Sequence, residues 1–149
     1  MILLVHLLFA AAIGSVIKNI PLAIILAVLS HYLLDILPHV EYNIENIEKK
    51  QWEKSLPQFA KVLLDFCVGI LLILILSNNQ PIVYLCAILA IAPDGLSVLN
   101  IMFENKFLQA HSRIHQGKIH FLKHKKISKF WRSTSQIAVI LLSIFLFKL

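Results

Sequence analysis

The sequence contains few of the residues that form linkers, disulfide frameworks and charged surfaces. Only 4 of its 149 residues are glycine and 5 are proline, and no linker or low-complexity segment divides the chain. Both cysteines, Cys67 and Cys86, lie inside apolar runs, which excludes a disulfide framework and a Cys-x-x-Cys metal motif. Charged residues make up 15% of the chain, against about 25% in an ordinary soluble domain. We therefore expect one domain, residues 1–149, of a membrane protein.

Several functional motifs are also missing. The sequence has no Gly-rich phosphate loop, no Gly-x-Ser-x-Gly elbow and no His-Glu-x-x-His pair. The formal net charge of +6 comes from basic residues that are concentrated beside apolar runs. The sequence has no basic segment rich in aromatic residues on which the bases of a single-stranded nucleic acid could stack. We expect anionic membrane lipids, and no nucleic acid, as partners of these basic residues.

Long apolar runs dominate what is present, since 58% of the residues are hydrophobic. The runs cover about 2–17, 21–37, 59–77, 81–103 and 135–147. Because about 20 residues cross a bilayer, the third and fourth runs are long enough, while the others would rely on local thinning. The sequence predicts an all-α polytopic membrane helix bundle with about five spans. A re-entrant hairpin of the first two runs is the alternative.

Two long polar connections set the expected orientation. Residues 38–58 carry mixed charge, whereas residues 104–134 are strongly basic. Five spans would place both connections on one side, and the positive-inside rule assigns that side and the N-terminus to the cytoplasm. Apolar residues interleaved with Lys and Arg predict that 104–134 is a basic amphipathic segment on the headgroup layer. An ordinary positive-inside anchor is the alternative.

Ionisable side chains occur inside the apolar runs, where they are costly and indicate function. With five spans, each would lie within roughly 15 Å of the cytoplasmic boundary, at about 1.5 Å per residue. Further histidines follow directly after the second and fourth runs. These residues are His6, His31, Asp35, Asp65 and Asp94 within the runs, and His39, His111 and His115 just beyond them.

The spacing of these residues favours a metal site. His31 and Asp35 lie one helical turn apart, as do His111 and His115. Imidazole and carboxylate ligands suit a divalent metal, with Zn²⁺ or Mn²⁺ the expected ions, and there are enough ligands for one or two. The predicted ligands are His6, His31, Asp35, His39, Asp94 and His111; Asp65 and His115 are predicted catalytic acid/base groups, and Arg113 is the predicted contact for an anionic headgroup.

Individual residues also have structural interpretations. His6 could be a hydrogen-bonded interhelical histidine, and Asp94 could satisfy backbone groups freed by Pro93. Asp65 could pair with Lys61 one turn earlier. His120 and His124 stand among lysines, and we expect both to be solvated.

The pattern resembles that of the membrane-bound metal-dependent hydrolases of bacterial and archaeal inner membranes. The resemblance is clearest over residues 6–42, from His6 in the first run to the cluster His31-x3-Asp35-x2-Pro38-His39. In place of the family's usual Pro-Asp-x-Asp-His cluster, this chain has Asp35-x2-Pro38-His39 and a separate Pro93-Asp94. The resemblance implies a prokaryotic inner-membrane location, a bound metal and hydrolysis.

The sequence therefore predicts an enzyme, a metal-dependent hydrolase acting at the cytoplasmic face on a lipid or lipid-linked phosphoester, with a metal-activated water as nucleophile. Two alternatives remain. A transporter or a metal or proton conduit would need polar residues through both halves of the membrane. A non-catalytic membrane or partner-binding protein would use the same polar residues to fix helix packing.

Overall fold

The computed structural model describes residues 1–103, 105–122 and 125–149, and these residues form helices, turns and coil without strands. The all-α prediction is therefore confirmed for the described residues. Each predicted apolar run forms one long helix: α1 (Leu3–Val16), α2 (Ile20–Ile36), α4 (Leu56–Leu76), α5 (Pro81–Met102) and α7 (Lys129–Leu146). The connections contain α3 (Glu45–Glu48), the 3₁₀ helix η1 (Trp52–Lys54), α6 (Lys106–Ile114) and the π-helix η2 (His115–Ile119).

Polar side chains and prolines fix where several helices begin. Asn19 caps α2 by accepting a hydrogen bond from the Leu22 N–H at 3.0 Å. Asn105 caps α6 in the same way through the Phe107 N–H at 2.8 Å. Proline occupies the first turn of α2, α4 and α5, where its missing N–H costs no helical hydrogen bond. The short connections between apolar runs are therefore encoded locally.

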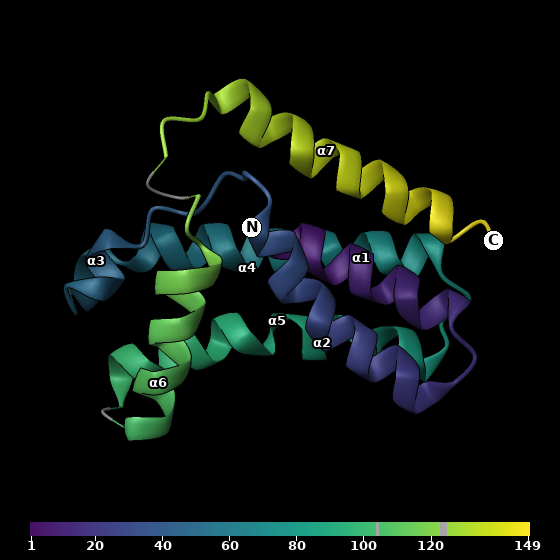
Figure 1. Cartoon of the computed structure of the whole chain (residues 1–149), viewed down its shortest axis with the longest axis horizontal. Coiled ribbons are helices and arrows are strands. Elements are labelled where there is room, and N and C mark those ends of the chain that lie inside the picture. Colours follow the sequence, from purple (N-terminus) through teal and green to yellow (C-terminus); the bar gives the residue numbers. More distant parts are fainter. Residues whose placement is uncertain (104, 123–124) are drawn as a thin grey trace.

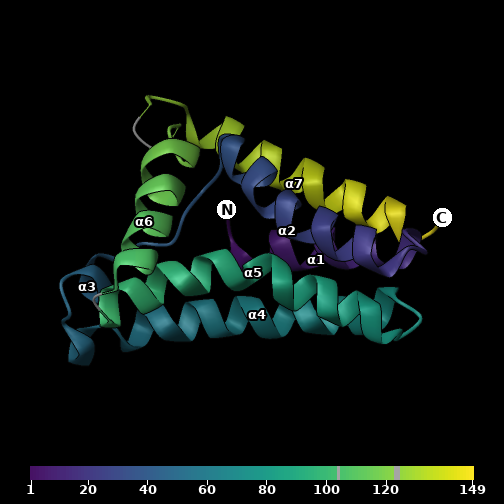
Figure 2. The ribbon, with the colours of Figure 1, turned by 60° about the horizontal axis from the view of Figure 1, so that its bottom comes forward.

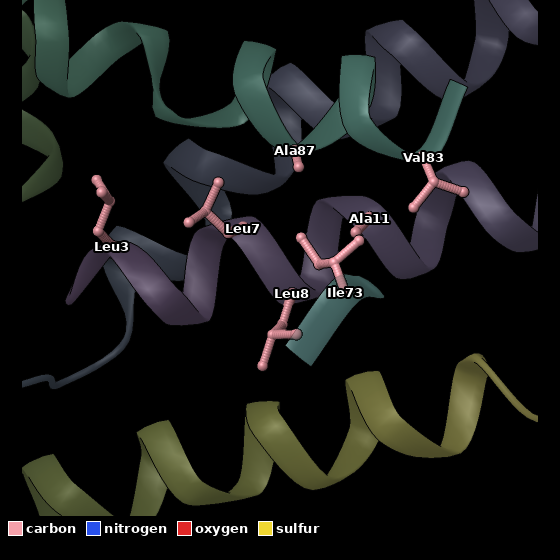
Figure 3. Close-up of a cluster of buried hydrophobic side chains, with 7 residues drawn as sticks. All are labelled: Leu3, Leu7, Leu8, Ala11, Ile73, Val83 and Ala87. Carbon is pink, nitrogen blue, oxygen red and sulfur yellow. The ribbon is translucent and has the colours of Figure 1, made fainter. Parts of the chain in front are cut away.

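Helix α1 lies at the centre of the bundle and packs against α2, α4, α5 and α7 (Figure 1). Leu7, Leu8 and Ala11 of α1 are buried against Ile73 of α4 and neighbouring α5 residues (Figure 3). Gly14 allows the closest approach to α5, because a Cβ atom there would lie 3.1 Å from Val83 Cα. The first apolar run is thus the core of the fold.

The outward faces of the long helices are strongly apolar. Leu64 and Ile75 of α4, Leu33 of α2 and Leu141 of α7 are among many large aliphatic side chains that remain exposed. Such extensive apolar exposure is unusual for a water-soluble monomer. The bundle therefore has apolar side chains on its outer surface and several ionisable side chains in its interior.

Two of the described helices, α4 and α5, are long and apolar enough to cross a membrane. The coarser prediction of membrane-spanning helices is supported to that extent, and five spans are not confirmed. Helices α1 and α2 have 14 and 17 residues, so they reach only about 21 and 26 Å, short of a core of about 30 Å. Helix α7 begins with polar turns that carry Lys129, Arg132 and Gln136.

Helix α6 stands across one end of the bundle and leads from α5 back toward α7 (Figure 2). The N-terminus lies at this same end, and the C-terminus lies at the other (Figures 1 and 2). The start of α1, the end of α2 and the part of α5 around Asp94 approach one another beside η2. This region contains the candidate site.

Candidate metal centre

The carboxylate of Asp35 is fully buried in the last turn of α2. His31, one turn earlier, places its Nε2 atom 3.1 Å from Asp35 Oδ2. The two side chains share one helical face, as their spacing predicted. Helix α2 ends immediately after Asp35 because residues before a proline avoid helical conformation, and Pro38 follows.

Helix α1 contributes His6, whose Nε2 atom lies 3.2 Å from the other oxygen of Asp35, Oδ1. The imidazole of His6 is fully buried, and its ring centroid is 4.3 Å from that of His31. The amino group of Met1 also lies beside Oδ1, at 2.5 Å. Asp35 is therefore surrounded by nitrogen atoms on both of its oxygens.

The π-helix η2 brings two further histidines to Asp35. The Nε2 atoms of His115 and His120 lie 3.2 and 3.1 Å from Asp35 Oδ2. The expectation that His120 is solvated was wrong, because its side chain is buried. The His120 N–H donates to the His115 carbonyl at 3.2 Å, an i to i+5 bond that puts both rings on one face. Their five-residue spacing was the sequence signal; His124 lies outside the described residues.

Asp94, on α5, approaches the cluster that Asp35 forms with its surrounding histidines. Its Oδ1 atom lies 3.8 Å from His31 Nε2 and 3.9 Å from His115 Nε2. Helix α5 continues through Pro93, and the Ser97 hydroxyl donates to the Pro93 carbonyl at 3.2 Å. Asp94 is partly exposed, whereas the two histidines are fully buried, so it lies at the edge of the cluster.

His39 follows Pro38 and reaches the cluster from the segment after α2. Its Nε2 atom lies 3.9 Å from Asp35 Oδ1 and 3.3 Å from Glu41 Oε1. Glu41 also accepts a hydrogen bond from His120 Nδ1 at 3.0 Å. Glu41 is absent from the predicted site residues, because it is one of several charged residues in the mixed-charge connection 38–58.

Arg132, at the start of α7, holds this segment in place. Its guanidinium donates to the carbonyl oxygen of His39 at 2.9 Å, of Leu122 at 3.1 Å and of Lys125 at 3.2 Å. The planar guanidinium thereby connects the backbone that carries His39 to the backbone just beyond His120. Arg132 is therefore a positioning residue for His39 and His120. It could not be singled out in the sequence, because it is one of many basic residues in 104–134.

The hydrogen bonds of the Nδ1 atoms determine which ring nitrogen faces Asp35. His39 Nδ1 bonds to a backbone carbonyl at 2.6 Å, and His120 Nδ1 bonds to a carboxylate. His115 Nδ1 lies 3.0 Å from the Ser97 hydroxyl, which already donates its hydrogen to a carbonyl. In the metal-binding form, each Nδ1 would carry the proton and each Nε2 lone pair would face the cluster; in the structure, His115 Nε2 is hydrogen-bonded to Asp35 Oδ2 at 3.2 Å. Metal-binding histidines are oriented in this way.

Among the described residues, two groups could hold a metal ion. The Asp94 set comprises His31, Asp35, Asp94 and His115, and the His39 set comprises Asp35, His39 and His120. A tetrahedral ion with bonds of about 2.1 Å separates its ligand atoms by about 3.4 Å. In the Asp94 set, five separations run from 2.9 to 3.9 Å around that value. The prediction that these residues could hold a metal ion is therefore supported, while the metal's charge, identity and number stay predictions.

His111 and His120 differ in their electrostatic environment. Burial lowers the pKa of His111, and the neighbouring His115 lowers it further. His111 Nε2 lies 3.3 Å from the Tyr32 hydroxyl, and the residue belongs to neither set. Burial alone would lower the pKa of His120, but the adjacent Asp35 and Glu41 carboxylates raise it to about 9. A proton therefore competes with a cation at His120.

Asp65 and Arg113 lie outside this arrangement. Asp65 accepts hydrogen bonds from the Leu4 N–H at 2.8 Å and from the Tyr42 hydroxyl. Asp65 thus caps the start of α1. Burial of the Tyr42 hydroxyl and its hydrogen bond to Asp65 raise the pKa of Tyr42 above its usual range. Arg113 is exposed on α6. Catalytic roles for these two residues stay predictions, and their positions do not favour them.

A pocket of about 240 Å³ adjoins the cluster. Glu41, Asp94 and His120 belong to both the pocket wall and the cluster. Most of the remaining wall is apolar and comes from α1, α4, α5 and the segment around α3: Leu3, Ile44, Ile47, Phe59, Val62, Val98 and Ile101. The pocket therefore joins a hydrocarbon-lined space to a group of potential metal ligands.

Comparisons with known proteins do not identify the chain. No protein-family model matches it, and neither a curated protein nor a solved structure is significantly similar to it. Its function must therefore be inferred from the geometry of the cluster and the pocket.

Proposed function

We propose that the protein is a membrane-embedded metal-dependent hydrolase whose substrate is a lipid or a lipid-linked phosphoester. The observation that carries this proposal is the position of the buried His/Asp cluster at the end of an apolar-walled pocket. A substrate with a hydrocarbon part and a hydrolysable polar part fits both surfaces at once. The resemblance of residues 6–42 to membrane-bound hydrolases agrees with this assignment.

The charges around the pocket support a requirement for a metal. Glu41, Glu48 and Asp94 line it, and none of its described lining residues is Lys or Arg. Met1 also lines the pocket and its amino group pairs with Asp35, so the three lining carboxylates would still repel an anionic phosphoester unless a further cation offsets them. A divalent ion would do so, and it would also polarise a phosphoryl oxygen and lower the pKa of a water nucleophile.

Hydrolysis of a phosphoester needs a proton acceptor and a proton donor besides the metal. The oxygen of water bonds to phosphorus, the bond from phosphorus to the alcohol oxygen breaks, and the alcohol leaves with a proton. Glu41, which lines the pocket and is hydrogen-bonded to His120, can exchange that proton. It replaces Asp65 as our acid/base candidate because Asp65 does not line the pocket.

The exposed apolar faces support a location in the membrane, with the cluster near one boundary. The basic residues of 104–134 favour the cytoplasmic side, and exposed Phe107, Phe130 and Trp131 would enter the headgroup layer. In intact cells, a probe at Ser128→Cys, in a Cys67→Ser background, should resist membrane-impermeant thiol reagents. Labelling from outside would reverse the orientation and move the site to the other face.

The two alternative functions make different demands on the interior. A conduit needs polar groups along the bundle, but α1 continues beyond His6 with the buried apolar residues Leu7, Leu8 and Ala11. A purely structural role for the histidines would use hydrogen bonds, but Nδ1 of His6 and Nδ1 of His31 have no hydrogen-bond partner among the described residues. A ligand-binding role accounts better for these buried nitrogens.

The direct test is turnover by purified protein in detergent or vesicles loaded with Zn²⁺ or Mn²⁺. We expect release of a water-soluble headgroup or inorganic phosphate from at least one member of a panel of phospholipids and polyprenyl phosphates. Chelation should abolish turnover, and readdition of metal should restore it. Asp94→Asn should remove turnover, because it removes a carboxylate shared by the cluster and the pocket.

Glu45→Gln is the matched control, since it also removes one carboxylate but acts on an exposed pair with Lys49. It should keep wild-type turnover. If the metal-loaded wild type hydrolyses no member of a broad panel, the hydrolase proposal fails and a partner-binding role gains support.

A further inference from the structure

The two candidate ligand sets share one residue, Asp35. We propose that the cluster binds two divalent ions at once and that the Asp35 carboxylate bridges them. Each oxygen of a bridging carboxylate can face a different ion, and paired ions in such sites stand about 3.5–4 Å apart. Nitrogen atoms approach both oxygens of Asp35. Met1 N and the Nε2 atoms of His6 and His39 lie 2.5, 3.2 and 3.9 Å from Oδ1, and the Nε2 atoms of His31, His120 and His115 lie 3.1, 3.1 and 3.2 Å from Oδ2.

The Asp94 set provides a nearly closed site for the first ion. Its four residues come from α2, α5 and η2, and its separations match the edges of a tetrahedron of ligand atoms. The Nε2 atoms of His31 and His115 are only 2.9 Å apart. Four protein ligands around one position are typical of a metal that is held firmly by the protein.

The His39 set provides the second site, and its nitrogen atoms supply an independent observation. His39 Nε2 and His120 Nε2 are buried and have no hydrogen-bond partner among the described residues, although carboxylate oxygens are close: Glu41 Oε1 and Asp35 Oδ1 lie 3.3 and 3.9 Å from His39 Nε2, and Asp35 Oδ2 lies 3.1 Å from His120 Nε2. Buried ring nitrogens without hydrogen bonds are uncommon. Because Leu37 and Glu41 occupy the two Nδ1 atoms, the neutral imidazoles would direct both Nε2 lone pairs toward Asp35. A cation between them satisfies both nitrogens and the carboxylate.

The two sites differ in how they face the pocket. The His39 set has three protein ligands, one fewer than the Asp94 set, which leaves a coordination position for water or substrate. His120 lines the pocket, so that open position is within reach of a substrate. Assigning the second ion to substrate binding rests on the proposed hydrolase function. The two-ion stoichiometry does not.

The experiment measures metal per chain in the full-length protein, with Zn²⁺ or Mn²⁺ alone as the probe. Native mass spectrometry and elemental analysis should give two ions for the wild type. His39→Gln and Asp94→Asn should each retain one ion, and Asp35→Asn should retain none. His111→Gln is the matched histidine control, because His111 belongs to neither set, and it should retain two.

Electron paramagnetic resonance of the Mn²⁺-loaded protein distinguishes a bridged pair from two separate ions. The wild type should give the spectrum of a spin-coupled pair, and His39→Gln should give that of an isolated ion. Thermal unfolding of the metal-free variants verifies that each one folds. At saturating metal, one ion or none per wild-type chain, or two uncoupled ions, would overturn the inference.

The outcomes also separate this inference from the proposed function. One ion per chain with lipid hydrolysis intact would refute the bridged pair and leave the hydrolase in place. Two coupled ions without turnover of any substrate would confirm the pair and refute the hydrolase.

Discussion

Replacing Arg132 with alanine tests whether α7 positions the His39 set. The substitution removes charged donors from the carbonyls of His39 and Leu122, which lie 2.9 and 3.1 Å from the guanidinium. Hydrogen bonds from charged groups contribute about 1.5–3 kcal/mol each, and water can replace part of that at a half-buried site. We expect the free energy of unfolding to fall by about 2–4 kcal/mol. The His39 set should also lose affinity for metal by about 10–100-fold, as when groups that orient metal ligands are removed.

The assay is titration of the metal-free protein with Zn²⁺ against a competing chelator, together with thermal unfolding in detergent. Arg132→Lys should recover part of the loss, because it keeps the charge but cannot reach several carbonyls at once. Lys129→Ala removes a positive charge from an exposed position on the same helix and should change stability by less than about 0.5 kcal/mol. If Arg132→Ala binds metal with wild-type affinity, α7 does not position the site.

Three further predictions concern packing, capping and pH. Gly14→Val should lower the free energy of unfolding by about 1–3 kcal/mol, whereas Gly95→Ala, where a Cβ atom meets open space, should not lower it; equal thermal shifts would contradict the close packing of α1. Asp65→Asn should cost about 1–3 kcal/mol by weakening its bond to the Leu4 N–H, while metal content stays unchanged; loss of metal would place Asp65 in the site after all. Zn²⁺ affinity should rise as pH increases toward 9, because His120, with its pKa raised to about 9, must lose a proton to bind metal; affinity constant from about pH 6 to 9 would contradict that competition.

The sequence predicted the long helices well, because each is encoded by its own apolar run and several begin at a local start signal. Asn19, Pro57 and Pro81 mark helix starts within a few residues of the predicted ones. The number of spans was not predictable in the same way. The interior of this bundle is apolar and so is its exterior, and hydropathy alone therefore cannot distinguish a short buried helix such as α1 from a spanning one.

The site was predicted where local spacing determines geometry, and it was missed where tertiary contacts do. His31 and Asp35 face each other because they are one turn apart on a regular helix. His120 joins them only through a π-helical turn, and Glu41 joins only because α7 holds the preceding segment against η2. Asp65 lies at the depth expected of a site residue, yet its carboxylate caps the start of α1 instead of joining the cluster. Depth in the membrane alone does not determine where a residue lies around the bundle axis.

Anomalous X-ray diffraction from crystals grown with Mn²⁺ tests most directly whether the Asp35 cluster is a metal centre. We expect anomalous peaks about 2.0–2.3 Å from the Asp35 oxygens and from the Nε2 atoms of His31 and His115. A structure without any peak in the cluster at saturating Mn²⁺, in which the histidines are hydrogen-bonded directly to Asp35, would contradict the claim.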